Sequence, residues 1–123
     1  MKKIVVLGAS PKASRYSNKA VKDLVSGAYG EYEVIPVTPK GGEVHGISCH
    51  LTLDTVSAGV DTLTLYLGPT GSTAILANVL ALKPKRIIFN PGTENELLQA
   101  KATAAGIECL EACTLILLHT GQF

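Results

Sequence analysis

The chain has 123 residues, of which 46% are hydrophobic and 17% charged, so it can bury a core and is not a disordered segment. A net charge of +1, aromatic residues at 5% and the absence of Trp exclude nucleic-acid binding through general basicity or base stacking. No run approaches the roughly 18 apolar residues of a membrane span, and the three cysteines have no framework spacing. We therefore expect one cytoplasmic domain over residues 1–123.

Short apolar runs rich in β-branched residues recur along the chain and predict buried strands. They cover residues 3–7, 33–37, 61–67, 86–89 and 107–110. Segments with apolar side chains at spacings of three and four lie between these runs and predict helices. The first helix has Ser14 or Ser17 as its expected cap and ends near Gly27. Its expected apolar face consists of Ala20, Val21, Leu24, Val25 and Ala28.

Two further helices follow the third and fourth strands. One covers residues 73–82, with Thr70 or Ser72 as its expected cap. The other begins in a capping box, in which Thr93 caps the helix and Glu96 lies three positions further on.

The remaining segments are less regular. Residues 38–53 show no period and predict a long connection, with one short helix near residues 54–58. Residues 115–118 form a final apolar piece, either strand or helix. The alternation of strands and helices predicts an α/β fold: a doubly wound, mainly parallel five-stranded sheet, Rossmann-like, with helices on both faces.

An open parallel sheet binds ligands beyond the carboxyl ends of its strands. Four loops lie there, at residues 8–17, 38–42, 68–72 and 90–94. The first carries two cations, Lys12 and Arg15, and three hydroxyls, Ser10, Ser14 and Ser17. Backbone N–H groups and the start of a helix attract anions, which makes a diphosphate the natural ligand. The alternative is a tight turn with two solvated cations.

A nicotinamide dinucleotide fits this loop poorly. Of the G-x-G-x-x-G fingerprint only Gly8 is present, with Ser10 and Ala13 at the other two places. The second strand ends in the segment 36–40, PVTPK, which has no acid to hold a ribose diol and instead has Lys40. A lysine there suits a ribose that carries a phosphate, as in NADP or coenzyme A, unless Lys40 is only a solvated loop residue.

The sequence resembles the small CoA-binding domain proteins of bacteria and archaea over nearly its whole length. The matching segments are VVLGASPK (5–12), RYS (15–17), EVIPVTPK (33–40), PGTENE (91–96) and GIE (106–108), followed by Cys113. The segment TPKGG (38–42) is also similar to the nucleotide loop of the succinyl-CoA synthetase α-subunit, whose N-terminal domain has this fold.

The resemblance implies a role for each matching loop in binding coenzyme A. The residues that would lie at the diphosphate are Gly8, Ser10 and Lys12, with Arg15, Ser17 and Asn18 beside them. Those that would meet the ribose and its 3′-phosphate are Thr38 and Lys40. The adenine side would be lined by Leu67, Gly68 and Pro69, and the pantetheine path by Pro91, Gly92 and Glu94.

Catalytic and metal-binding patterns are weak. His45, Cys49 and His50 lie close in sequence, but a metal site would need a fourth ligand, and a polar loop is the preferred interpretation. Cys109 and Cys113 fit the usual role of small buried hydrophobes. Since no nucleophile, base and orienting group come together in the sequence, we do not expect an enzyme.

The sequence therefore predicts a protein that binds coenzyme A or an acyl-CoA and acts as a carrier, sensor or regulator. Two alternatives from the enzyme class are an NADP-binding reductase-like protein and a subunit that supplies the CoA site to a catalytic complex. A third alternative is an interaction module without a ligand. A protein partner or a second copy could pack on the apolar segment 115–118.

Overall fold

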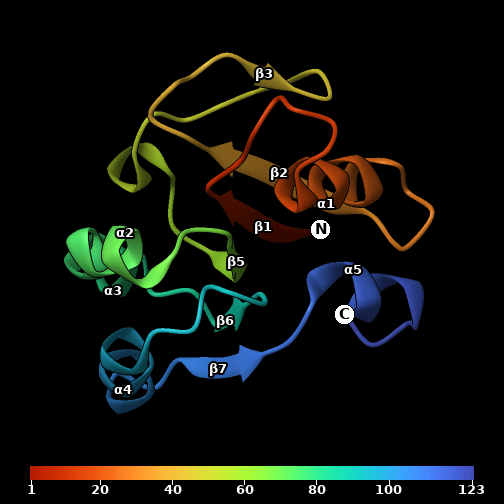
Figure 1. Ribbon diagram of the computed structural model, residues 1–123. Helices are drawn as coiled ribbons and strands as arrows, with labels where there is room; N and C mark the ends of the chain where they lie inside the picture. Colours follow the sequence, from red (N-terminus) through yellow and green to blue (C-terminus); the bar gives the residue numbers. More distant parts are fainter.

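The centre of the protein is a parallel sheet, shown in a computed structural model that describes residues 1–123 (Figure 1). Its strand order is β2-β1-β5-β6-β7, and every neighbouring pair is parallel. The strands are β1 (Lys2–Leu7), β2 (Tyr32–Val37), β5 (Val60–Leu65), β6 (Arg86–Phe89) and β7 (Glu108–Glu111). The chain winds from β1 to one edge and then from the other side of β1 to the opposite edge, which confirms the predicted doubly wound five-stranded sheet.

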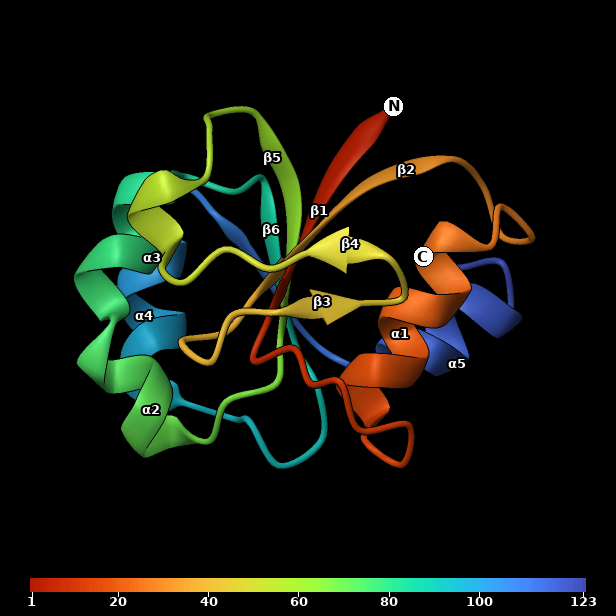
Figure 2. The ribbon, with the colours of Figure 1, turned by 90° about the horizontal axis from the view of Figure 1, so that it is seen from above.

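Helices cover both faces of the sheet, as predicted (Figures 1 and 2). On one face lie α1 (Tyr16–Val25) and the short α5 (Thr114–His119). On the other lie α2 (Pro69–Ala74), α3 (Leu76–Leu82) and α4 (Glu96–Ala104). The segment 115–118 is therefore helical, and Leu118 packs into the protein's own core while Ile116 is 60% exposed. No helix of the protein is long and apolar enough to cross a membrane.

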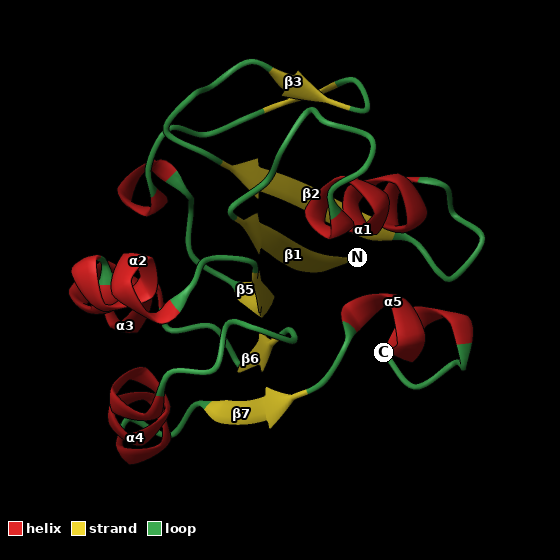
Figure 3. Ribbon diagram, in the orientation of Figure 1, coloured by secondary structure: helices red, strands yellow, loops and turns green.

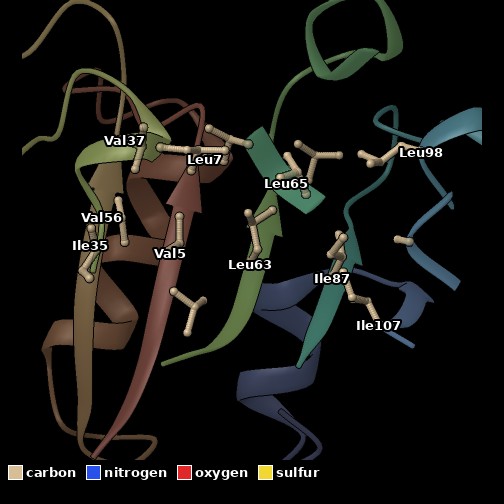
Figure 4. Close-up of a cluster of buried hydrophobic side chains, with 14 of the residues drawn as sticks. Val5, Leu7, Ile35, Val37, Val56, Leu63, Leu65, Ile87, Leu98 and Ile107 are labelled. Carbon is tan, nitrogen blue, oxygen red and sulfur yellow. The ribbon is translucent and has the colours of Figure 1, made fainter. Parts of the chain in front are cut away.

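Alternating side chains of the strands feed two separate cores. Val5 and Leu7 point toward α3 and α4 into a cluster of 15 buried residues (Figure 4). Ile4 and Val6 point the other way, into a cluster of eight that includes Val21 of α1. Because side chains alternate across a strand, burial on both faces requires the near-continuous apolar runs seen in the sequence. On α1 the expected apolar face is buried at Ala20, Val21 and Leu24, whereas Val25 and Ala28 are exposed.

The helix expected at residues 73–82 was wrong in its start and continuity. It consists of α2 and α3, which are separated at Ile75 by a non-helical backbone conformation. Gly68 occupies the N-cap position and Pro69 the first turn, where a proline lacks no needed donor. Thr70 and Ser72 consequently lie inside α2 and do not cap it.

The segment after β2 contains a small hairpin that the sequence did not predict, whereas the short helix expected near residues 54–58 is present at residues 53–55 (Figure 3). A small hairpin of β3 (Glu43–Val44) and β4 (Ile47–Ser48) is followed by one turn of 3₁₀ helix, η1 (Leu53–Thr55). The turn residues of the hairpin, His45 and Gly46, have φ of 48° and 81°, which is typical of a two-residue hairpin turn. Val44 is buried in the cluster beneath α1, so the hairpin folds back onto the domain.

Candidate functional site

The loops that leave the carboxyl ends of the strands meet at one edge of the sheet, at the bottom of Figure 2. The first loop is tied to β2, because the backbone N–H groups of Gly8 and Ala9 both donate to the carbonyl of Val37, at 3.0 and 3.2 Å. It is tied to the segment after β5 by a bond from Tyr66 N to Leu7 O of 2.9 Å. The predicted meeting place of the loops thus exists.

Gly8 is required where the first loop turns away from the sheet. Its φ is +91°, and a Cβ built there would lie 3.1 Å from the backbone carbonyl of Tyr66 and from the side chain of Leu67. Only glycine fits both the backbone angle and the space. The close approach brings the first loop against the segment predicted to line the adenine side.

The start of α1 is uncapped. Arg15, in an extended conformation, occupies the N-cap position and makes no side-chain cap, so the expected caps Ser14 and Ser17 were wrong. The N–H groups of Tyr16, Ser17 and Asn18 donate to no acceptor in the chain. Such free N–H groups, with the positive end of the helix dipole, form a site for an anion.

Three cations from two neighbouring loops lie near this edge. Lys12 and Arg15 belong to the loop that enters α1, and Lys40 belongs to the loop that follows β2. All three are exposed, and no carboxylate lies within 4.0 Å of their charged atoms. Their charge is therefore available to a ligand.

Thr38 is buried and shapes the loop that carries Lys40. Its hydroxyl accepts from Lys40 N at 3.4 Å, and its carbonyl accepts from Gly41 N at 3.1 Å. The turn thus fixes the backbone of Lys40 beside the first loop. A Cβ built at Gly41 would lie 3.1 Å from the side chain of Leu51, which is 58% exposed.

Asn18 has a structural position that the sequence did not reveal. The side chain is 5% exposed and its Nδ2 donates to Ser10 O at 2.9 Å, which holds the middle of the first loop. Ser10 Oγ in turn accepts from Lys12 N at 3.2 Å. Ser17 is also buried, at 4% exposure. Asn18 therefore shapes the first loop, and its neighbour Ser17 is buried at the same helix start.

The loop after β6 is held by Asn90, which sequence reasoning missed. Its Nδ2 donates to Leu65 O at 2.9 Å and to Thr64 Oγ1 at 2.7 Å, and its Oδ1 accepts from Thr114 N at 2.9 Å. The signal available in the sequence was an asparagine directly after a buried strand. The loop above it presents Pro91 and Gly92 to solvent.

The predicted capping box at α4 was wrong by two residues. Asn95 caps the helix, since its Oδ1 accepts from Leu98 N at 3.1 Å. Thr93 is buried and donates its hydroxyl to Asn90 O at 2.7 Å. The Glu94 carboxylate accepts from Gly92 N at 3.0 Å, so this predicted site residue closes its own loop.

The residues predicted to line the adenine side lie where β5 passes into α2. Leu67 is half-buried against the larger core cluster, and Gly68 and Pro69 begin α2 with exposed surfaces. Next to them, burial raises the pKa of Tyr66 to about 12, although hydrogen bonds with Thr64 and Thr114 act in the opposite direction. Tyr66, directly after β5, therefore stays a neutral phenol near neutral pH.

The histidines and cysteines do not gather into a metal site. His45 Nε2 lies 2.7 Å from Asn18 Oδ1, and His50 Nδ1 lies 2.8 Å from Thr55 Oγ1. No group of three or more His, Cys, Asp or Glu side chains could hold a metal ion. Burial raises the pKa of both Cys49 and Cys109, with Glu43 and Glu108 adding to the effect.

Two cavities lie away from these loops. One of about 290 Å³ lies between η1 and α3 and is mostly apolar. The other, of about 340 Å³, is lined by charged side chains at the amino ends of the strands, among them Lys2, Asp61 and Arg86. The candidate site is thus the surface formed by the loops.

This fold and loop arrangement match a known family. The family model described as "CoA binding domain" matches residues 2–119, so the chain belongs to the CoA-binding domain family and the predicted resemblance is confirmed. Membership in this family supports binding of coenzyme A. A comparison with curated proteins finds no match.

Solved structures show the same fold. A crystal structure of an uncharacterized protein is 45% identical, with a TM-score of 0.92, and the match covers 100% of this chain and 98% of that one. A protein from Thermus thermophilus is 29% identical, with a TM-score of 0.86 and coverage of 99% and 90%. At 21% identity and a TM-score of 0.73, a dinucleotide forming acetyl-coenzyme A synthetase from Ca. Korarchaeum cryptofilum shares the fold over 90% of this chain and 25% of its own.

Proposed function

We propose that this protein binds coenzyme A or an acyl-CoA at the carboxyl edge of its sheet and acts as a carrier, sensor or regulator without chemistry of its own. The observation that carries the proposal is the uncapped start of α1, with three free N–H groups beside the unpaired cations Lys12 and Arg15. A diphosphate supplies the negative charge and the acceptor oxygens that this arrangement lacks.

The distribution of charge over two loops favours a ligand with two separated phosphate groups. The diphosphate would lie on the first loop, and the 3′-phosphate of coenzyme A would lie by Lys40 after β2. In this orientation the adenine lies toward Leu67 and the pantetheine chain toward Pro91 and Gly92. Acidic groups would oppose such a ligand, and the nearest acid on these loops, Glu94, already accepts from Gly92 N.

Two of the three thiols and two of the three histidines favour a binding role. Because burial raises the pKa of Cys49 and Cys109, both stay protonated at neutral pH, and the thiol is the poor nucleophile of the two forms. His45 and His50 each hydrogen-bond a neutral side chain, and neither lies within hydrogen-bonding distance of a thiol. On this proposal, an acyl-CoA that binds here is released without a chemical change.

The test is a calorimetric titration with CoA, dephospho-CoA and NADP at fixed salt. We expect CoA to bind about tenfold to a hundredfold more tightly than dephospho-CoA, since a hydrogen bond to a charged group contributes about 1.5–3 kcal/mol. Lys40→Ala should bring this ratio close to one. Lys101→Ala, which removes an exposed cation from α4, is the matched control and should keep the ratio.

Each other outcome contradicts part of the proposal. Equal binding of CoA and dephospho-CoA would remove the role of Lys40, and binding of NADP alone would move the protein to the reductase-like class. No binding of any of the three would overturn the function. Release of free thiol from acetyl-CoA above the rate without protein would show that the protein is an enzyme.

A further inference from the structure

One buried amide joins the first loop to the β3–β4 hairpin. Asn18 Nδ2 donates to the carbonyl of Ser10 at 2.9 Å, and Asn18 Oδ1 lies 2.7 Å from His45 Nε2. Asn18 is 5% exposed, so its amide is shielded from water on its own side of both contacts, while His45 is exposed. The three residues form a chain of hydrogen bonds from the hairpin turn to the middle of the loop that we propose binds the diphosphate.

The direction of these bonds decides that the Nε2 atom of the histidine carries a hydrogen. Because Nδ2 faces the Ser10 carbonyl, Oδ1 must face His45, and an amide oxygen only accepts. His45 Nε2 therefore carries a hydrogen, either as the neutral Nε2–H tautomer or as the imidazolium. The bond to Asn18 persists in both states.

The hairpin is a firm support for this bond. Val44 beside the turn is 1% exposed, and the segment after β4 pairs with β2 through His50 N to Pro36 O and Thr38 N to His50 O, both 2.9 Å. His45 takes a φ of 48°, an unusual angle for a residue other than glycine, and from there its ring reaches Asn18. An anchored turn thus holds a side chain against the first loop.

We propose that His45 is a positioning residue for ligand binding, which acts through Asn18. The inference rests on the proposed function, since the loop it holds is the one assigned to the diphosphate. With Asn18 fixed, the Ser10 carbonyl stays bonded to the amide and does not turn toward a bound anion. The loop is then already in its binding conformation before the ligand arrives, which removes the cost of ordering it.

The decisive variant is His45→Asn. Asn-Gly is the favoured sequence for a two-residue hairpin turn, so the hairpin should fold at least as well, but the shorter side chain no longer reaches Asn18. We expect CoA to bind about three- to tenfold more weakly, the factor that one lost hydrogen bond of ordinary strength gives. The ratio between CoA and dephospho-CoA should stay unchanged, because Lys40 is untouched.

His45→Gln supplies the rescue. The Gln amide nitrogen lies about as far from the backbone as Nε2 of histidine and can donate to Asn18, so its CoA affinity should return toward the wild-type value. His50→Asn is the control within the same segment, since the His50 ring bonds only to Thr55. This control should bind CoA as the wild type does.

A second measurement does not depend on coenzyme A. In the ligand-free protein, amide hydrogen exchange between Ala9 and Ser14 should be faster in His45→Asn than in the wild type and His50→Asn. Unchanged exchange or unchanged CoA affinity in His45→Asn would overturn the role of His45, and so would a Gln variant as weak as the Asn variant. If the wild type binds no CoA while exchange changes as expected, the proposed function fails and the link between the hairpin and the loop stands.

Discussion

The starts of α1 and α4 lie at the same edge of the sheet but satisfy their N–H groups in different ways. At α4 the Asn95 side chain accepts from Leu98 N, and Glu96 in the first turn complements the helix dipole. At α1 the N-cap residue is Arg15, which makes no side-chain cap, and the first turn has no acid. The start of α4 is capped by the protein itself, whereas the start of α1 keeps its N–H groups free.

On the proposed function, this difference separates a helix start that stabilises the fold from one that binds a ligand. A capped start stabilises the fold, whereas an uncapped start forgoes that free energy and keeps its donors. The charged side chains follow the same division, because the cations Lys12 and Arg15 lie at the start of α1 and the acids Glu94 and Glu96 lie at the start of α4. Both helices point their positive ends at the edge, but only α1 combines free N–H groups with nearby cations, which is why we propose the diphosphate there.

The loops that lead into α1 and α4 also differ in how closely their glycines are packed. This difference gives the largest expected effect on stability. Gly8 and Gly92 have φ of +91° and +88°, but only a Cβ at Gly8 would meet other atoms, at 3.1 Å. Gly8→Ala should lower the free energy of unfolding by about 2–4 kcal/mol, from backbone strain and crowding together. Gly92→Ala, the matched variant, should lose only the backbone part, about 1–2 kcal/mol. Urea unfolding measures both, and equal losses would show that the Tyr66 backbone yields freely.

Removing the cap from the start of α4 should lower the stability of the protein. Asn95→Ala removes the cap and also the donor to Ser72 Oγ, 2.7 Å away in a buried site. We expect a loss of about 2–3 kcal/mol in unfolding free energy, from the lost cap and the lost buried bond to Ser72, whose hydroxyl keeps only its long bond of 3.4 Å to Pro69 O. CoA affinity at the intact α1 start should change little. A large loss of affinity without a loss of stability would contradict the division between the two starts.

Most of the fold could be predicted because a strand that is buried on both faces of the sheet needs a nearly continuous apolar run, and such runs are visible in the sequence. The hairpin was missed because β3 and β4 have two residues each, too few to show an alternation. The break at Ile75 was missed because the apolar spacing continues through it. The place of the first loop, between the first strand and the first helix, was predictable from the order of the elements, and its binding of a phosphate stays a prediction.

The caps and the long-range contacts were beyond the sequence. Several polar residues stand at each helix start, and which of them takes the extended N-cap conformation depends on tertiary contacts, as when the Thr93 hydroxyl is taken by Asn90 O. The bond between Asn18 and His45 joins residues 27 positions apart, which no local pattern records. The site residues named from the family resemblance stay predictions until a ligand is measured.

Tyr66 lies beneath the edge between the two helix starts and gives a smaller, pH-dependent effect. Burial raises its pKa from 10.0 to about 12, so the folded protein holds the phenolic proton more tightly than the unfolded chain. Its contribution is fully present below pH 10 and is lost as the pH rises to about 12, by up to about 2 kcal/mol. Urea unfolding at several pH values should show a steeper alkaline loss for the wild type than for Tyr66→Phe. Parallel loss in the two proteins would show that the phenol is not protected by burial.

The smallest expected change in stability tests the comparison most directly. Arg15→Ser removes a charge and places a good cap on α1, whereas Arg15→Ala removes the same charge and adds no cap. The free energy of unfolding of the Ser variant should therefore be about 1 kcal/mol higher than that of the Ala variant. Both should bind CoA more weakly than the wild type through the lost charge. The Ser variant should bind about threefold more weakly still, because its hydroxyl accepts from an N–H group that the diphosphate would otherwise use.

A gain in stability coupled to a loss in affinity is the signature of N–H groups reserved for a ligand. Urea unfolding and CoA titration of the two variants supply the comparison, and the Ala variant controls for the charge. If Arg15→Ser is more stable than Arg15→Ala but binds CoA equally well, the N–H groups of Tyr16, Ser17 and Asn18 do not contact the diphosphate. The attraction of the edge for an anion would then come from Lys12 and Arg15 alone, and the α1 start would be uncapped for a reason unrelated to the ligand.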